Sequence, residues 1–412
     1  MNRRSFLRTA TAGAAGLLLT PPWIASLRAA TEKARDLNLR VTDLKTFVVG
    51  TGSSNFLFCK VYTNQGLIGL GEGSVSSKEA TVSAAILEHH RYLVGKDPTD
   101  IELHWQAMFR NPRWRGGPIL NSAISAIEIA LWDILGQSLG QPIYKLLGGK
   151  ARERIRLYKD VPSTVEAFLA AKQEGFTAAK ATCIRVDNNI VVPHYTVNEG
   201  VKLVEAVRKA VGDEFDICID VKGEVTPTMA MEFCTRVEPF RPMFVEEASQ
   251  LEDFGELAML RQKTKVPLAT GERSFTKYGF TEFCSRHLVD YIQPDVCHAG
   301  GILEMKKIGA MAEAFRVEMA PHNPQSEVST VASLHVDATT PSATIQEVNP
   351  SGIPWLVDLF QGGGIKYKNG YADLPDKPGL GVTLDDRVAA AHPYQPYTRP
   401  QFKFADGSVA DL

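Results

Sequence analysis

The chain lacks the features that mark several large functional classes. Its 412 residues carry 45 basic and 47 acidic side chains, which gives a formal net charge of −2, and no long basic run interrupts this balance. A nucleic-acid partner is therefore not indicated. There is also no low-complexity tract, no sequence repeat beyond a strand–helix rhythm and no internal charged linker.

Cysteine is scarce and scattered. The six cysteines include no CxxC pair and no cluster of the kind that staples small secreted domains. Several lie in apolar strand-like or helical runs, so we expect buried free thiols. With 44% hydrophobic residues the composition is that of a globular protein, and the length allows two or three domains or one barrel with an appendage.

The first thirty residues differ from the rest. MNRRSFLRTA TAGAAGLLLT PPWIASLRAA has a basic start, a short apolar run and an end that contains alanine. Arg3-Arg4-Ser5-Phe6-Leu7 resembles a twin-arginine export signal, and Pro21 and Pro22 interrupt the apolar run, so no stable membrane anchor is expected. We expect residues 1–30 to be a signal read by the twin-arginine machinery, which implies a periplasmic or otherwise exported protein. A basic amphipathic tail is the alternative.

Residues 38–150 show strands first and helices afterwards. RVTDLKTFVV, NFLFCKVYTN and GLIGLGEG resemble a meander, and AISAIEIALWDILGQSL has apolar residues at helical spacing. This order predicts an α+β capping domain.

Residues 151–361 instead alternate between strand and helix. Eight strand candidates are RIRLYKDV, FTAAKATC, FDICID, PMFVEE, VPLATG, LVDYIQPD, RVEMAPH and TIQEVN. The fold class predicted is therefore α/β: a modified, TIM-like (β/α) barrel, whose site lies at the C-terminal ends of its strands. The Gly- and Pro-rich segment 362–412 is expected to return to the capping domain.

Three of these strands end in carboxylates at an even spacing. Asp220, Glu246 and Glu272 stand 26 residues apart, about one strand–helix repeat. Neighbouring parallel strands would bring their oxygens to one point, and an all-oxygen set without His or Cys favours Mg²⁺ over Zn²⁺. Acidic residues at a polar rim are the alternative interpretation.

A histidine and an aspartate follow the next two strands. Asp295 ends the sixth strand and His322 ends the seventh, so the two are neighbours in a barrel. A hydrogen bond from the ring to Asp295 would fix the tautomer of His322 and raise its basicity, as suits a general base. His287, His298 and His335 lack this setting.

Other polar side chains stand at strand ends. Lys222 lies two residues past Asp220 and would face the mouth with it, where an ammonium beside a cation gives up its proton more readily; pairing with a carboxylate is the alternative. Lys180 would anchor a substrate carboxylate or pair with the metal carboxylates. Glu347 would donate a hydrogen bond or be a rim acid, and Asn323 is a candidate polar contact.

The chain resembles the enolase superfamily, in its mandelate racemase branch and near the galactonate and mannonate dehydratases. The resemblance rests on KVYTNQGLIGLGEG, AISAIEIALWDILGQSLGQPIYKLLGG, VEPFRPMFVEE, the GE of the fifth strand, QPD, APHNP and LPDKPGLG. It implies a capped barrel that binds Mg²⁺ through Asp220, Glu246 and Glu272 and abstracts a proton α to a carboxylate. It also implies His322 with Asp295 as the base dyad and Glu347 as hydrogen-bond donor to the enediolate.

One position departs from this pattern. The galactonate-type dehydratases carry histidine where this chain has Lys222, and that histidine is the acid that helps the β-hydroxyl leave. Lysine can also protonate a leaving group. The paired-lysine motif of superfamily racemases is incomplete here, because Lys180-Ala181-Thr182 supplies one lysine.

The leading prediction is thus a Mg²⁺-dependent hydro-lyase that converts a sugar acid to its 2-keto-3-deoxy product. An epimerase, racemase or cycloisomerase working through the same enediolate is the second hypothesis, and an exported sugar-acid binding protein without turnover is the third. Trp114 and Arg115 are candidate substrate contacts, with a packing tryptophan and a surface turn as the alternatives. The resemblance also implies a homo-oligomer.

Overall fold

The structure is a computed structural model that describes residues 38–184, 186–251, 253–350, 352–362 and 365–410. The predicted export signal, residues 1–30, lies outside the described residues. The part from Leu39 onwards is one compact unit.

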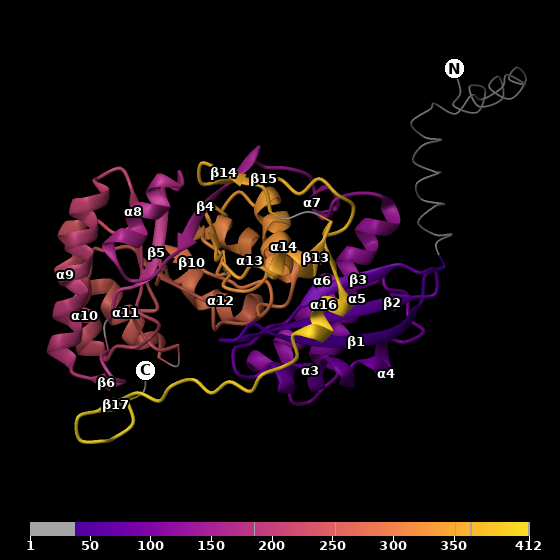
Figure 1. The fold of residues 1–412 in the computed structure, drawn as a ribbon, viewed down its shortest axis with the longest axis horizontal. Coiled ribbons are helices and arrows are strands. Elements are labelled where there is room, and N and C mark those ends of the chain that lie inside the picture. The colour runs from indigo at the N-terminus through magenta and orange to yellow at the C-terminus, as the bar shows by residue number, and fades with distance from the viewer. Residues whose placement is uncertain (1–37, 185, 252, 351, 363–364, 411–412) are drawn as a thin grey trace, which may run out of the picture. The chain divides into compact units, whose positions relative to one another are not determined.

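A three-stranded antiparallel meander opens this unit, with β2 in the middle. Helices cover it, and together they form the cap, which is indigo to purple in Figure 1. The elements are β1 (Val41–Gly50), β2 (Asn55–Thr63), β3 (Ile68–Glu72), α3 (Glu79–Glu88), α4 (His90–Leu93), α5 (Ile101–Arg110), α6 (Gly117–Leu139) and α7 (Ile143–Leu146).

The helix α6 packs unusually close to β3, and glycines make this possible. A Cβ on Gly69 would lie 2.0 Å from the carbonyl oxygen of Ala130, and one on Gly71 would lie 1.9 Å from that of Ala126. Of the helices in the described ranges, only α6 is long and apolar enough to cross a membrane. Because 83% of its apolar window is buried, α6 is a core helix of the cap.

Parallel strands then alternate with helices and close into a barrel (Figure 1). All eight predicted strands are present: β4 (Arg154–Asp160), β5 (Ala178–Thr182), β7 (Asp216–Asp220), β8 (Phe244–Glu246), β9 (Leu268–Thr270), β10 (Tyr291–Ile292), β11 (Glu318–Met319) and β12 (Gln346–Val348). β12 pairs with β4, and an isolated parallel bridge joins Met319 of β11 to Ala343, in the segment that leads into β12. The predicted barrel is therefore confirmed.

The helices between the strands cover the outside of the barrel. They are α8 (Val165–Gln173), α9 (Pro193–Val211), α10 (Pro227–Val237), η1 (Glu238–Phe240), α11 (Phe254–Lys263), α12 (Thr276–Ser285), α13 (Ile302–Phe315) and α14 (Glu327–Thr339). The amphipathic α9 shows why they pack there, since Val197, Val201, Val204 and Val207 recur at helical spacing and are buried.

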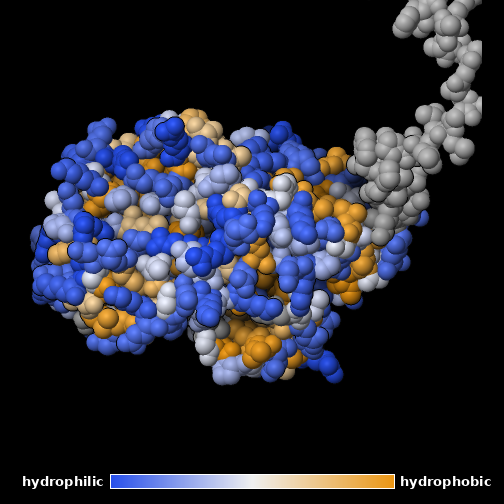
Figure 2. Space-filling model, turned by 90° about the horizontal axis from the view of Figure 1, so that it is seen from above, coloured by the Kyte–Doolittle hydropathy of each residue, from blue (hydrophilic) through white to orange (hydrophobic). Residues whose placement is uncertain are grey.

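The barrel interior is a packed core of small and aromatic side chains. One buried cluster contains Tyr158, Ala178, Cys218, Phe244, Ala269, Ala320 and Ile345. All six cysteines are buried and free, as the sequence predicts. The face in Figure 2 is mainly hydrophilic, and its hydrophobic residues form separate patches.

The C-terminal segment contacts both the barrel and the cap. β15 (Tyr371–Asp373) adds antiparallel to β4, and Asn55 of β2 exchanges two 2.9 Å hydrogen bonds with the backbone of Gln395. The other elements are β6 (Ile190–Val191), α15 (Leu356–Leu359), β13 (Phe360–Gln361), β14 (Tyr367–Lys368), β16 (Thr383–Leu384), α16 (Asp386–Ala391) and β17 (Lys403–Phe404), which pairs with β6.

Candidate active site

Three carboxylates stand at the C-terminal ends of neighbouring barrel strands. Asp220 ends β7, directly opposite Glu246 at the end of β8, and Glu272 lies two residues past β9. Burial raises the pKa of Asp220, and the nearby Glu272 charge raises it further against the ammonium of Lys180. The pKa of Glu246 is raised well above its ordinary value, first by burial and then by the charges of Asp220, Glu347 and Glu272, although Lys180 opposes this.

The oxygens of these carboxylates are held by other groups. Lys180 Nζ donates to Glu246 Oε1 (3.1 Å), His322 Nε2 lies 3.2 Å from Glu272 Oε2, and the backbone N–H of Lys222 donates to Asp220 Oδ1 (2.7 Å). As the side chains stand, no group of three or more His, Cys, Asp and Glu residues in the described ranges is arranged to hold a metal ion.

The chemistry of the three carboxylates nevertheless fits a hard divalent cation. The donor set consists of oxygen atoms alone, which suits Mg²⁺. Glu246 Oε2 is buried and has no hydrogen-bond partner among the described residues, so one carboxylate oxygen remains available to a ligand.

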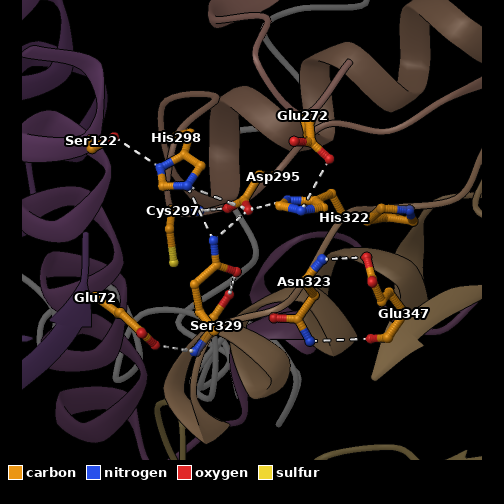
Figure 3. Close-up of polar contacts among 12 residues, drawn as sticks. Glu72, Ser122, Glu272, Asp295, Cys297, His298, His322, Asn323, Ser329 and Glu347 are labelled. Carbon is orange, nitrogen blue, oxygen red and sulfur yellow. Dashed lines mark hydrogen bonds and ion pairs between the residues drawn. The ribbon is translucent and has the colours of Figure 1, made fainter. Parts of the chain in front are cut away.

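His322 and Asp295 form a close pair opposite these carboxylates. His322 Nδ1 lies 2.7 Å from Asp295 Oδ2, and Figure 3 shows the ring between Asp295 and Glu272. Burial disfavours the charged ring, but Glu272, the hydrogen bond to Asp295 and the charge of Glu347 outweigh it and raise the pKa of His322 to about 10. Asp295 keeps a lowered pKa despite its burial, because His298 and His322 favour its charged form.

Lys180 and Asn323 both contact Glu347 at the end of β12. Lys180 Nζ lies 2.9 Å from Glu347 Oε1, and the backbone N–H of Asn323 donates to Glu347 Oε2 (2.9 Å). The Asn323 side chain donates to Thr330 Oγ1 (2.7 Å) and to the Glu347 carbonyl (3.1 Å). Both Glu347 side-chain oxygens thus act as acceptors in this arrangement.

Lys222 differs from the expectation in its backbone. Its φ is 53°, so the segment after Asp220 turns into the left-handed region and is not extended. The argument that side chains two apart point the same way is therefore wrong here. The Lys222 residue is exposed, and burial raises the pKa values of Asp220, Glu224 and Asp160 while the positive charge of Lys222 opposes this rise, so Lys222 lies near the mouth.

Trp114 and Arg115 lie in the cap, in the segment between α5 and α6. Trp114 is 82% exposed, and the guanidinium carbon of Arg115 lies 5.2 Å from the centre of the Phe109 ring. Both line a 360 Å³ cavity formed by cap residues, including Met108 and Ile124. The structure does not bring these two side chains to the carboxylates, and their contact with substrate stays a prediction.

The sequence argument missed three further residues that belong to the site. Asp160 ends β4, and burial and the charge of Glu347 raise its pKa to about 6. A carboxylate that closes the strand-like run RIRLYKD was the signal that could have found it. His298 and Gln325 surround Asp295, with Gln325 Nε2 2.7 Å from Asp295 Oδ2 and 3.1 Å from His298 Nε2.

Together the fold and the site define a (β/α) barrel with an acidic mouth beneath an α+β cap. Residues 33–148 match the mandelate racemase / muconate lactonizing enzyme N-terminal domain, and residues 164–388 match the enolase C-terminal domain-like family. The chain therefore belongs to the enolase superfamily, in the branch named for these two enzymes.

The chain is similar to several proteins and solved structures of this family. A D-galactonate dehydratase from Ralstonia pickettii is 37% identical over 386 residues, 90% of this chain and 100% of that protein. An enolase from Pantoea ananatis, solved with bound D-gluconate and Mg, is 29% identical, with a TM-score of 0.84 over 91% of this chain and all of that one. The 3,6-anhydro-D-galactonate cycloisomerase from Zobellia galactanivorans is 29% identical, with a TM-score of 0.79 over 86% of this chain and all of that one.

Proposed function

We propose that this protein is a Mg²⁺-dependent acid-sugar dehydratase, which removes the proton α to a carboxylate and eliminates the β-hydroxyl to give a 2-keto-3-deoxy sugar acid. The observation that carries the proposal is the His322–Asp295 pair facing Glu272 across the barrel mouth. The similarity to D-galactonate dehydratases supports the reaction class.

Asp220, Glu246 and Glu272 would hold the cation. When bound, Mg²⁺ supplies positive charge that polarises the substrate carboxylate and makes its C2–H more acidic. The positive charge would also take the place of the His322 imidazolium beside Glu272, so that His322 Nε2 would be free to accept a proton.

His322 is the proposed base. With Nδ1 held by Asp295, Nε2 is the ring atom directed to the carboxylates, and it would take the C2 proton. Lys180 keeps a raised pKa, because Glu246 and Glu347 outweigh the effect of its burial, so it stays an ammonium beside the developing negative charge. Glu347 contacts Lys180, and its carboxyl group, when protonated, would donate a hydrogen bond to the enediolate.

Lys222 is the proposed acid for the leaving hydroxyl. Its exposed ammonium lies near Asp220 and Glu224 at the rim, from which it would reach the leaving hydroxyl. Transfer of one proton from the ammonium to the departing oxygen completes the elimination as water.

A second candidate function follows from the same residue. The resemblance implies that the galactonate-type dehydratases carry histidine at the position of Lys222. A cycloisomerase is among the similar structures. Return of a proton or ring closure from the enediolate would give an epimerase or a cycloisomerase.

A screen separates these reactions. The protein with Mg²⁺ is incubated with a library of sugar acids in D₂O and followed by proton NMR. Dehydration gives a 2-keto-3-deoxy product and supports the proposal. Deuterium at C2 or a rearranged product, without loss of water, assigns the second function. Ligand-dependent stabilisation with neither exchange nor product assigns a binding protein.

Export and assembly belong to the proposal as well. The Arg3-Arg4-Ser5-Phe6-Leu7 pattern supports export through the twin-arginine machinery to the periplasm. Cell fractionation of the full chain and of an Arg3→Lys/Arg4→Lys variant tests this, since the variant should stay in the cytoplasm. Light scattering of the purified protein tests the expected homo-oligomer.

A further inference from the structure

Asp295 accepts hydrogen bonds from other groups as well as from the proposed base, His322. Its Oδ2 lies 2.7 Å from both His322 Nδ1 and Gln325 Nε2, and its Oδ1 accepts the backbone N–H of Cys297 (2.7 Å). The side chain is fully buried. Three donors thus fix the carboxylate plane, and this plane sets the direction of the His322 ring.

His298 connects this pair to the cap. Its Nδ1 lies 2.8 Å from the Oγ of Ser122, which belongs to α6 (Figure 3). Its Nε2 lies 3.1 Å from Gln325 Nε2. An amide nitrogen only donates, so the contact with Gln325 is a hydrogen bond when His298 is neutral, with Nε2 as the acceptor and with the proton on Nδ1, which then donates to Ser122. The remaining N–H of the amide then donates to Asp295.

A second route of hydrogen bonds leads from the cap to the oxygen of the Gln325 side-chain amide. Ser329 Oγ donates to Gln325 Oε1 (3.5 Å), and the backbone N–H of Ser329 donates to Glu72 Oε2 (3.0 Å). The hydroxyl of Ser326 also donates to Glu72 (2.6 Å). Glu72 is the last residue of β3, so both routes begin on cap elements and meet at Gln325.

We propose that Gln325 and His298 are positioning residues through which the docked cap sets the geometry of the His322–Asp295 base. The inference rests on the proposed function for its catalytic consequence. Neither residue touches the carboxylates of the candidate metal site in the structure. Their effect is to hold Asp295 so that His322 keeps its proton on Nδ1 and presents Nε2 to the substrate.

Kinetics of four variants test this. Gln325→Leu removes the shared amide, His298→Asn removes the ring, and Ser122→Ala removes only the cap contact. The control is His335→Asn, which alters another fully buried histidine, on α14, whose Nδ1 accepts the Tyr144 N–H and which has no contact with Asp295.

We expect the first two variants to lose roughly 10- to 100-fold in kcat at nearly constant KM, as for other residues that orient a catalytic ligand. Their isotope effect with C2-deuterated substrate should rise, because proton abstraction becomes the slow step. Ser122→Ala should also lower kcat and raise the isotope effect, but to a smaller extent. Losses equal to those of His335→Asn, or changes in KM alone, would overturn the proposal.

A second readout does not depend on turnover. In protein labelled with ¹⁵N-histidine and saturated with Mg²⁺, the wild type should show His298 protonated on Nδ1. Gln325→Leu and Ser122→Ala should shift the His322 ring nitrogens, and His335→Asn should leave them in place. Unshifted His322 signals in Gln325→Leu would refute the coupling, whereas shifted signals in a protein without dehydratase activity would refute only the proposed function.

Discussion

Lys180 Nζ lies 2.9 Å from Glu347 Oε1 and 3.1 Å from Glu246 Oε1, inside the barrel mouth. All three side chains are buried, so the ammonium is shared by two carboxylates that come from opposite sides of the barrel. Of the two roles that the sequence leaves open for Lys180, pairing with carboxylates is the one present in the structure.

This relationship predicts a large loss of stability on removal of the ammonium. Lys180→Met would leave Glu246 and Glu347 buried without the Lys180 ammonium, and we expect the free energy of unfolding to fall by roughly 3–5 kcal/mol. Urea denaturation measures the change. Lys159→Met is the control, because Lys159 pairs with Glu174 at the surface and should cost less than about 1 kcal/mol. Equal losses in the two variants would contradict the interpretation.

Metal binding should depend on Glu272 specifically. Glu272→Gln removes one of the three proposed charges, and we expect Mg²⁺ affinity measured by calorimetry to fall roughly tenfold or more, with loss of turnover. Glu247→Gln is the control, since Glu247 is a buried carboxylate whose Oε1 accepts a hydrogen bond from Arg273 Nε at 2.7 Å. Retained Mg²⁺ affinity and activity in Glu272→Gln would exclude this metal site.

Lys222→Ala separates proton abstraction from elimination. If Lys222 is only the acid, the variant should still exchange the C2 proton through His322 but form no 2-keto-3-deoxy product. Proton NMR in D₂O follows both signals in one sample. Loss of exchange together with product would instead place Lys222 in the abstraction step.

Stability should also depend on pH through Asp337, which is remote from the site. Burial raises the pKa of Asp337 to about 8 from its ordinary 3.8, against the opposing charge of Arg152, and neither carboxylate oxygen has a hydrogen-bond partner among the described residues. The folded state therefore keeps a proton that the unfolded state releases, and the free energy of unfolding falls as pH rises from about 4 to 8.

Asp337→Asn should remove this contribution to the slope. At pH 8 the variant should be more stable than the wild type by about 1–3 kcal/mol, and the difference should vanish near pH 4. Thermal denaturation at several pH values measures both. A variant with the same pH slope as the wild type would show that Asp337 is not the responsible group.

The ends of the barrel strands could be predicted from the sequence because the pattern of strand followed by helix repeats. Each buried strand is a short apolar run, and in a barrel every such run delivers its last residues to the same end. The positions of Asp220, Glu246, Asp295 and His322 follow from this rule, and the structure brings them together. The same rule applied to β4 would have included Asp160.

The remaining contacts depend on packing that no local pattern encodes. His298 and Ser122 are 176 residues apart and meet only because α6 of the cap lies against the barrel. The turn at Lys222 has a positive φ in a residue other than glycine, which a strand pattern does not reveal. Lys180 could not be assigned from sequence, since its partners come from two other strands.

The central claim is that His322 removes the C2 proton of a sugar acid. The most direct measurement compares wild type and His322→Asn, both with Mg²⁺ in D₂O, by following the C2–H signal of sugar acids by proton NMR. We predict that the wild type exchanges or eliminates this proton and that His322→Asn, still binding Mg²⁺, does neither. Exchange at the wild-type rate in His322→Asn would contradict the account.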